Sequence, residues 1–180
     1  GRIWMDRNLG AAQVATDTTD VFSYGDLYQW GRRADGHQCR TSTTTTTLSS
    51  VDQPTNGNFI LVTSAPYNWR SPQNTNLWQG VSLINNPCPS SYRLPTQAEL
   101  IAEYQSWSSQ NSAGAFASPL KWTRAGNRDA GSGGLFGVGV SGDYWSSTVS
   151  GSASYNLDFS TGNVFMNFDN RGNGFSVRCI

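Results

Sequence analysis

The chain carries little charge and no excess of either sign. Its 180 residues include 12 Lys or Arg and 12 Asp or Glu, charged residues make up 13% of the total, and Lys121 is the single lysine. A protein that binds nucleic acid or an anionic membrane through its surface usually presents a basic patch. This composition does not supply one, so we expect no nucleic-acid partner.

Long hydrophobic runs are absent as well. No apolar stretch approaches the roughly 20 residues that a membrane-spanning helix needs, and no basic-then-apolar leader opens the sequence. We therefore expect no membrane insertion. The length suits a single domain over residues 1–180. Because the sequence begins directly on an apparent strand, we expect this domain to be the C-terminal part of a longer protein.

Residues that commonly act as nucleophiles or metal ligands are few. Histidine occurs once, as His37, in a polar loop without a nucleophile motif, and we interpret it as a solvated loop residue. The three cysteines, Cys39, Cys88 and Cys179, contain no CxxC pair, so neither a metal site nor another cofactor is expected. Their odd number leaves at least one without an intrachain partner. All three could also be buried reduced thiols.

What the chain has in quantity is Gly, Ser, Thr, Asn and seven Trp. Such a sequence contains many turn formers and few strong helix formers, and it predicts a loop-rich fold held by aromatic packing. From residue 32 to about 79 there is no sustained period, so we predict long loops that Trp69 and Trp78 fasten to the body. The composition is typical of an extracellular or virion protein.

Hydrophobic spacing predicts two helices. The first is a short one over residues 21–30, ending at Gly31. The second runs from about 97 to 108, because Thr96 and Glu99 form a capping box and Leu100, Ile101, Tyr104 and Trp107 follow at helical spacing. Residues 2–5 and 119–122 read as strands. We expect the strand at 2–5 to pair beside the last strand and to bring the two termini together.

After residue 142 the hydrophobic period becomes two. Leu157 and Phe159 are predicted to face inward, a turn follows at 161–163, and Val164 and Met166 again belong to the core. A last strand places Phe175, Val177 and Cys179 on one face. Together with the helices, these strands predict a small antiparallel sheet in an α+β fold.

Four motifs, in order along the chain, resemble one known family. They are Gly-Arg-Ile-Trp-Met-Asp-Arg-Asn-Leu-Gly at 1–10, Cys-Pro-Ser-Ser-Tyr-Arg-Leu-Pro-Thr at 88–96, Tyr-Trp-Ser-Ser-Thr at 144–148 and Arg-Gly-Asn-Gly-Phe-Ser-Val-Arg-Cys-Ile at 171–180. The chain resembles the Fibrobacter succinogenes-type major paralogous domain, a branch of the formylglycine-generating-enzyme-like folds. The resemblance implies a C-type lectin-like fold with small antiparallel sheets, two helices and long loops. It also implies a disulfide between Cys88 and Cys179.

Members of this family include ligand-binding variable proteins of diversity-generating retroelements, found on phage tail fibres and bacterial surfaces. In such systems adenine-directed mutation acts on Asn codons, which cannot become Lys, Glu or Gln codons through changes at their first two positions. All twelve Lys, Glu and Gln residues of this chain lie within 1–121. Glycine-rich hairpins can also avoid these residues without any diversification, and the sequence leaves both explanations open.

The resemblance therefore implies a ligand-binding domain at a phage tail-fibre tip or on a surface adhesin, with a protein or glycan receptor on a cell surface. In a tail fibre we expect a homotrimer. The outward residues of 143–171 are rich in Tyr, Asn and Ser, as in antibody loops. The predicted ligand face consists of Asp143, Tyr144, Ser152, Ser154, Tyr155, Asn156, Asp158, Ser160, Thr161, Asn163, Phe165, Asn167, Phe168, Asp169 and Asn170.

Two other functions are compatible with the resemblance. One is a non-diversified, secreted or lipid-anchored surface protein. The other is a formylglycine-type enzyme, but related enzymes use a cysteine pair near the end of the domain and only Cys179 is present there. We do not expect an enzyme. The sequence loops of calcium-dependent lectins are also missing; Asp158, Asp169 and Asn170 could offer oxygen ligands to calcium, and we interpret them as solvated turn residues.

Overall fold

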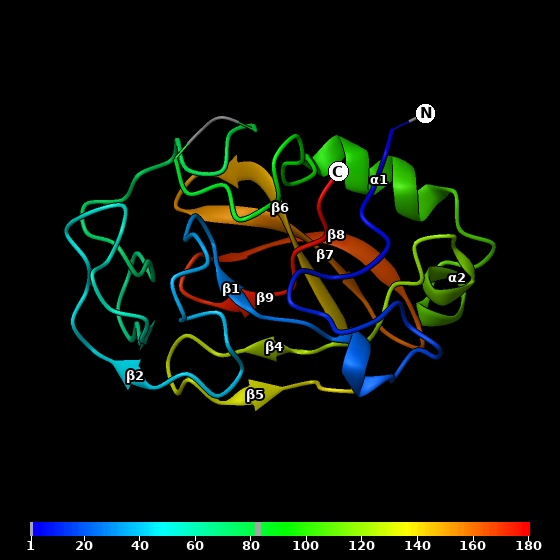
Figure 1. The fold of residues 1–180 in the computed structure, drawn as a ribbon, viewed down its shortest axis with the longest axis horizontal. Coiled ribbons are helices and arrows are strands. Elements are labelled where there is room, and N and C mark those ends of the chain that lie inside the picture. The colour runs from blue at the N-terminus through cyan, green and yellow to red at the C-terminus, as the bar shows by residue number, and fades with distance from the viewer. Residues whose placement is uncertain (1, 82–83) are drawn as a thin grey trace.

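The computed structural model describes residues 2–81 and 84–180. Within these ranges the chain has a mixed α+β architecture with two α-helices, a single 3-10 helix, nine short strands and extensive loops (Figure 1). This confirms the predicted α+β class. No helix among the described residues has the length and apolar character needed to cross a bilayer.

The longest strands form a three-stranded antiparallel sheet in the order β6-β7-β8. They span Gly142–Ser150, Ala153–Phe159 and Val164–Asn170. Strands β7 and β8 pair residue for residue, from Ala153 opposite Asn170 to Phe159 opposite Val164, and the chain turns between them at 161–163 as predicted. The pairing of β6 with β7 is interrupted between Trp145 and Val149.

Two smaller sheets complete the fold. An antiparallel sheet has the order β1-β9-β4-β5, made from Tyr28–Gln29, Gly174–Phe175, Asn127–Arg128 and Leu135–Phe136. In the loop region, β2 (Thr44–Thr45) pairs in parallel with β3 (Phe59–Ile60). Each of these strands has two residues, so loops make up most of residues 32–79, as predicted.

Helix α1 (Gln97–Gln105) begins at the predicted capping box. The Thr96 hydroxyl accepts from the Glu99 amide at 3.3 Å, and the Thr96 amide donates to the Glu99 carboxylate at 2.7 Å. These bonds satisfy amide groups that the first helical turn leaves free. The helix ends three residues before the predicted limit. Of the four residues expected to be buried, Leu100 and Trp107 are buried, whereas Ile101 and Tyr104 are half-buried. It packs over β6, β7 and β8.

The helix predicted at residues 21–30 is wrong. Only η1 (Val21–Ser23) is helical, capped by the Asp20 carboxylate that accepts from the Phe22 amide. Gly25 then adopts a φ of +66°, a left-handed conformation that an α-helix does not contain. After this break, β1 pairs with β9. Tertiary pairing therefore outweighs the helical spacing of the aromatic residues.

The strands predicted at 2–5 and 119–122 are also wrong. In the first segment the Met5 amide donates to the Cys179 carbonyl, but no strand forms. These contacts still place the first residues along the last ones, and the N and C ends lie beside α1 (Figure 1). Residues 119–122 form a turn after α2 (Ser112–Ala117). We missed α2 because this short segment has no apolar stripe; Asn111, its cap, was the available signal.

The three-stranded sheet lies between two hydrophobic clusters. One, next to α1, contains Leu100, Tyr144, Leu157 and Phe159. The other is built around Trp145, which stacks on Phe175 with ring centroids 4.3 Å apart. Because alternate residues of a strand point to opposite faces, neighbouring residues Tyr144 and Trp145 belong to different clusters.

The loops of residues 32–79 are fastened by the two tryptophans that the sequence singles out. The Trp69 indole N–H donates to the Trp30 carbonyl at 2.7 Å, and the Trp78 indole N–H donates to the Asn85 carbonyl at 2.8 Å. Both indole rings are fully buried. Buried indoles with satisfied N–H groups combine a large apolar contact with a directional anchor.

His37 is buried, so its interpretation as a solvated loop residue is wrong. Its Nε2 accepts from the Gln29 amide at 3.1 Å, which places the ring proton on Nδ1, 2.6 Å from the Asp35 carboxylate. Burial lowers the pKa of His37 to about 4, although the Asp35 hydrogen bond opposes this change. The ring therefore holds the loop to β1.

A disulfide bond joins Cys88 to Cys179, the pairing that the family resemblance implies. It links residues 91 positions apart and fixes the segment before α1 to the last residues of the chain. The remaining cysteine, Cys39, is exposed and free. Of the two arrangements left open by the cysteine count, the structure contains the bridged one.

Candidate binding face

The two faces of the β6-β7-β8 sheet have different surroundings. Directly paired residues of antiparallel strands project to the same side. The helix face, which α1 covers, therefore includes Tyr144, Leu157 and Met166. The opposite side, which we call the open face, consists of Asp143, Trp145, Ser154, Asn156, Asp158, Phe165, Asn167 and Asp169.

Eleven of the fifteen predicted ligand-face residues reach the surface. The exposed ones are Ser152, Thr161, Asn163, Phe165 and Phe168. The half-buried ones are Tyr155, Asp158, Ser160, Asn167, Asp169 and Asn170. They lie in β7 and β8, in the turn between these strands and in the turn before β7.

Four predicted ligand-face residues are buried, so their assignment as outward residues is wrong. Tyr144 belongs to the helix-face core, where its hydroxyl accepts from Asn8 at 3.0 Å and donates to the Thr123 carbonyl at 2.9 Å. The other three buried residues lie on β6 and β7: Asp143, Ser154 and Asn156. Strict alternation predicts which side a residue takes, but not how far a second layer covers that side.

The predicted face also divides between the two sides of the sheet. Tyr155 is paired with Phe168, and their rings meet edge to face at 6.2 Å. Because they are paired, both lie on the helix side of the sheet. They are close to the turn between β6 and β7, which contains Ser152, and Phe168 is 59% exposed there. Phe165, with the opposite parity, lies on the open face. The surface residues therefore form two patches, one on each side of the sheet.

Exposure on the open face increases from β6 to β8. In one row of paired residues, Asp143 is buried, Asp158 is half-buried and Phe165 is 42% exposed. In the next row, Trp145 and Asn156 are buried and Asn167 is half-buried. The solvent exposure of the open face thus increases across the sheet, and β8 is its accessible edge.

Two carboxylates face each other across neighbouring strands of the open face. Asp143 and Asp158 are direct cross-strand partners, an arrangement that destabilises a sheet when both groups are charged. Burial, with the nearby charges of Asp143 and Asp169, raises the pKa of Asp158 to about 6. Burial also raises the pKa of Asp143, although Asn127 and Ser141 donate hydrogen bonds to its Oδ2.

Among the described residues, no positive side chain forms an ion pair with Asp143, Asp158 or Asp169. Arg171 is buried at the other end of the open face, where it donates to Ser154 at 3.1 Å and stacks on Trp30. Within the described ranges, no group of three or more His, Cys, Asp or Glu side chains is arranged to hold a metal ion.

Asn156 occupies the centre of the open face. Its cross-strand neighbours are Trp145 and Asn167, and Asp158 is the next residue of β7 on this side. The side chain is 1% exposed, and neither its Oδ1 nor its Nδ2 has a hydrogen-bond partner among the described residues. Leaving a buried donor or acceptor unpaired is costly. Sequence reasoning included Asn156 as an outward contact but could not detect this unsatisfied amide.

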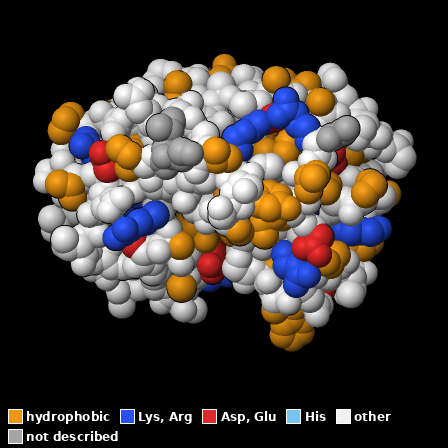
Figure 2. Space-filling view, turned by 45° about the horizontal axis from the view of Figure 1, so that its top comes forward, with side chains coloured by type: hydrophobic (Ala, Val, Ile, Leu, Met, Phe, Trp, Pro, Cys, Tyr) orange, Lys and Arg blue, Asp and Glu red, His pale blue; other side chains and the backbone are white. Residues whose placement is uncertain are grey.

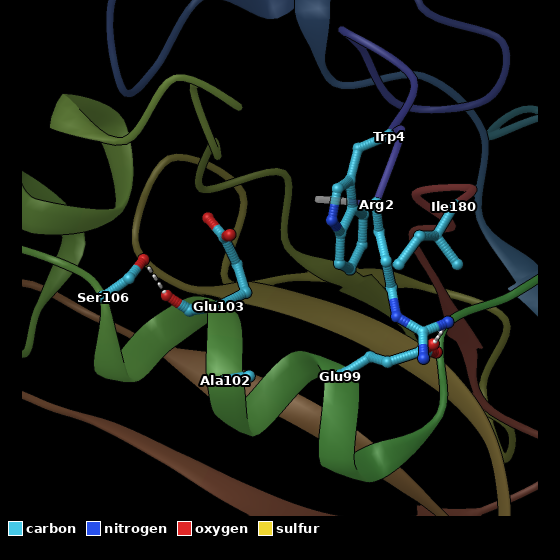
Figure 3. A pocket seen from close by; sticks show the side chains of 7 residues that line it. All are labelled: Arg2, Trp4, Glu99, Ala102, Glu103, Ser106 and Ile180. Atoms are coloured by element: carbon cyan, nitrogen blue, oxygen red, sulfur yellow. Dashed lines mark hydrogen bonds and ion pairs between the residues drawn. The ribbon is translucent and has the colours of Figure 1, made fainter.

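Two concave sites lie next to the sheet. A cavity of about 240 Å³ on the helix side is bounded by Arg2, Trp4 and α1 (Figure 3). Its carboxylates are already engaged: Glu99 pairs with Arg2 and Arg93, and Glu103 accepts from Trp107, Trp122 and Ser118. It therefore presents few unsatisfied groups to a ligand.

The second cavity, of about 340 Å³, lies at the end of β8. Asn170, from the predicted ligand face, lines it together with Asn173, Asp129 and Tyr67. Tyr67 and Asp129 belong to segments that sequence reasoning treated only as loops, and no local pattern marks them. The cavity extends the predicted face beyond the hairpin by tertiary contact alone.

Charged side chains are sparse on the face shown in Figure 2, where Lys and Arg are scattered among uncharged side chains and form no continuous basic surface. Comparisons of the chain with protein-family models, curated proteins and solved structures found no match. Functional inference therefore rests on the geometry of the β7–β8 hairpin and on the sequence.

Proposed function

We propose that this chain is a receptor-binding domain of the C-type lectin-like class, in which the β7–β8 hairpin carries a variable binding surface. The observation that carries the proposal is the contrast between the two sets of hairpin residues. Leu157 and Phe159 are fully buried, whereas Thr161, Asn163 and Phe165 are exposed. A fixed core under adaptable surface residues permits substitution without loss of the fold.

The chemistry of the surface residues supports the same proposal. Phe165 and Phe168 offer aromatic contact area, and the intervening Asn, Asp, Ser and Thr side chains offer adaptable hydrogen bonds, a combination that binding loops commonly use. Lys, Glu and Gln are absent from residues 122–180. Adenine-directed diversification of Asn codons would avoid these three residues, as glycine-rich hairpins also can without diversification.

We further propose that the domain works outside the cell, at the tip of a phage tail fibre or on a surface adhesin, and binds a protein or glycan receptor on a cell surface. The Cys88–Cys179 disulfide is compatible with an oxidising compartment. In a tail fibre, the domain would act as one member of a homotrimer. Calcium is not part of the proposal.

A non-diversified surface protein of the same family is the second candidate, and the burial of Asp143, Tyr144, Ser154 and Asn156 favours it. Buried positions tolerate few substitutions, so they are poor targets for diversification. A formylglycine-type enzyme has less support, because the cysteine near the end of the domain is bonded to Cys88.

The DNA next to the gene distinguishes the first two candidates. Diversification predicts a near-repeat of the segment that encodes residues 143–171, differing from the gene at adenines of the repeat, beside a reverse-transcriptase gene. The mismatches should fall on codons of exposed residues such as Thr161, Asn163 and Phe165, and should spare those of Leu157 and Phe159. The lack of any such repeat would favour the non-diversified surface protein.

A further inference from the structure

The open face of the sheet contains unpaired polar groups that the proposed function does not explain. One row of paired residues places Asp158 directly opposite Asp143, and the Asp158 carboxylate has no hydrogen-bond partner among the described residues. Next to this row lies Asn156, whose buried amide is unpartnered. The two features are independent, since one is a matter of charge and the other of hydrogen bonding. They converge on neighbouring positions of β7.

A ligand that pairs with the Asp158 carboxylate and the Asn156 amide must supply hydrogen-bond donors and positive charge. Carboxylates and an amide oxygen are acceptors, and two facing carboxylates at close range favour a cation between or beside them. A single metal ion fits poorly, because the described residues contain no cluster of three or more acidic, His or Cys ligands. A planar, extended cation can instead contact groups on adjacent strands, which lie roughly 5 Å apart.

The surroundings select the same kind of group. Phe165 is exposed at the accessible edge of the open face and is the cross-strand partner of Asp158. An aromatic ring beside a carboxylate favours a guanidinium, because this group can stack on the ring and donate hydrogen bonds to the carboxylate at the same time. Asn167 offers a half-buried amide next to Asn156. Its Oδ1 accepts from the Phe168 amide, and its Nδ2 has no acceptor within residues 2–81 and 84–180.

We propose that the open face binds an arginine side chain of a protein receptor, with the guanidinium over Asp158 and Asn167 and beside Phe165. Asp143 and Asp169 add negative charge on either side. The unpaired Asn156 amide shares this side of the sheet with Asp158 and Asn167 and is the further hydrogen-bonding group that the receptor segment would engage. This inference rests on the proposed function, because it specifies what the hairpin recognises.

The proposal can be tested without knowing the receptor. The ¹⁵N-labelled domain is titrated with N-acetylarginine methylamide and, separately, with N-acetylcitrulline methylamide, which has nearly the same shape and no charge. We expect the arginine probe to shift the side-chain amide signals of Asn156 and Asn167. Since charge-assisted hydrogen bonds exceed neutral ones in strength, it should bind roughly tenfold more tightly than the citrulline probe.

Asp158→Asn keeps the shape of the side chain and removes its charge, so it should weaken arginine binding about fivefold or more. Asp6→Asn is the matched control, because Asp6 is an exposed carboxylate paired with Arg7 and lies outside the three strands of the sheet; its effect should stay within about twofold. The backbone amide spectrum of each variant reports whether it is folded.

Equal binding of the two probes, or signals that shift only outside β7 and β8, would overturn the proposal. So would saturable shifts of the same amides with calcium chloride or with neutral methyl glycosides in place of arginine. Each of these results leaves the proposed receptor-binding function intact, because that function is judged independently by the adenine-specific repeat next to the gene.

Discussion

Glu99 and Asp158 are carboxylates on opposite sides of the same sheet, and their surroundings drive their pKa values in opposite directions. Burial alone would raise the pKa of Glu99, but hydrogen bonds from Arg93 and from the Thr96 amide outweigh it and hold the pKa at about 2. Asp158 is partly buried and lies near two other carboxylates, Asp143 and Asp169, and together these raise its pKa to about 6.

The difference separates a carboxylate that stabilises the fold from one that the fold tolerates. Glu99 connects the start of α1 to Arg93, whose backbone pairs with Ile180. Asp158 has no such connection. Residues that lower stability in the free protein are often retained because they take part in binding or catalysis, which is why we place the receptor contact at Asp158.

The largest expected effect comes from a carboxylate placed where neither hydrogen bonds nor water can reach it. Leu157 is fully buried next to Asp158 in sequence but on the other face. We expect Leu157→Asp to unfold the domain, with a loss of more than about 4 kcal/mol. Circular dichroism should show no cooperative thermal transition. Asn163→Asp adds the same charge in the exposed turn and should melt like the wild type; a cooperative melt for Leu157→Asp would contradict the core assignment.

Removal of the Glu99 charge should be the next largest effect. Glu99→Gln loses the ion pair with Arg93, and we expect a loss of about 2 kcal/mol in the free energy of unfolding at pH 7. Because the folded-state pKa lies below the unfolded value, this contribution is present above about pH 4.5 and is lost as the pH falls toward 2. Urea unfolding at pH 7 and pH 2.5 tests this: the difference between variant and wild type should shrink at the lower pH.

Asp158→Asn should change stability in the opposite sense. The folded-state pKa is raised, so the charged form destabilises the folded protein, and this cost appears as the pH rises from about 4 to about 6. We expect the variant to be more stable than the wild type by about 1 to 2 kcal/mol at pH 7.5, allowing for partial solvent exposure. At pH 4 the two should unfold at the same urea concentration. A destabilised variant at pH 7.5 would show that Asp158 is a structural carboxylate like Glu99.

The other half of the capping box should contribute less than Glu99. Thr96→Ala removes the hydroxyl that accepts from the Glu99 amide but leaves the ion pair with Arg93 in place. We expect a loss of about 1 kcal/mol, the usual value of a helix cap. Thr96→Ser retains the acceptor and is the control in the same thermal melt. If serine and alanine cost the same, the hydroxyl does not cap α1.

The smallest effect is expected at the surface of the hairpin. Combined substitution of Thr161 and Asn163 by serine should change the free energy of unfolding by no more than about 0.5 kcal/mol per site, because both residues are exposed in the turn. The test is urea unfolding, with Ser154→Ala as the contrasting buried substitution that removes one of the acceptors of Arg171. A large loss at the turn would show that it is not free to vary.

Sequence reasoning recovered elements whose information is local. The capping box at Thr96 and Glu99, the alternation around Leu157 and the 161–163 turn each depend on a few adjacent residues, and the structure contains all three. It failed at 21–30, where helical spacing of aromatics competes with pairing to β9, and at α2, where a short helix lacks an apolar stripe. Such short elements owe their state to packing rather than to propensity.

For the binding face, alternation within β7 and β8 determined which side chains share a side of the sheet, because that parity is a property of the extended backbone. Only the tertiary structure decided which of them water can reach. Asn156 and Asp158 have the same parity and similar polarity, yet one is buried beside Trp145 and the other remains half-exposed. Asn156 is paired with Trp145, whose hydrophobic cluster is built from segments far away along the chain, and no local pattern in β7 encodes their approach.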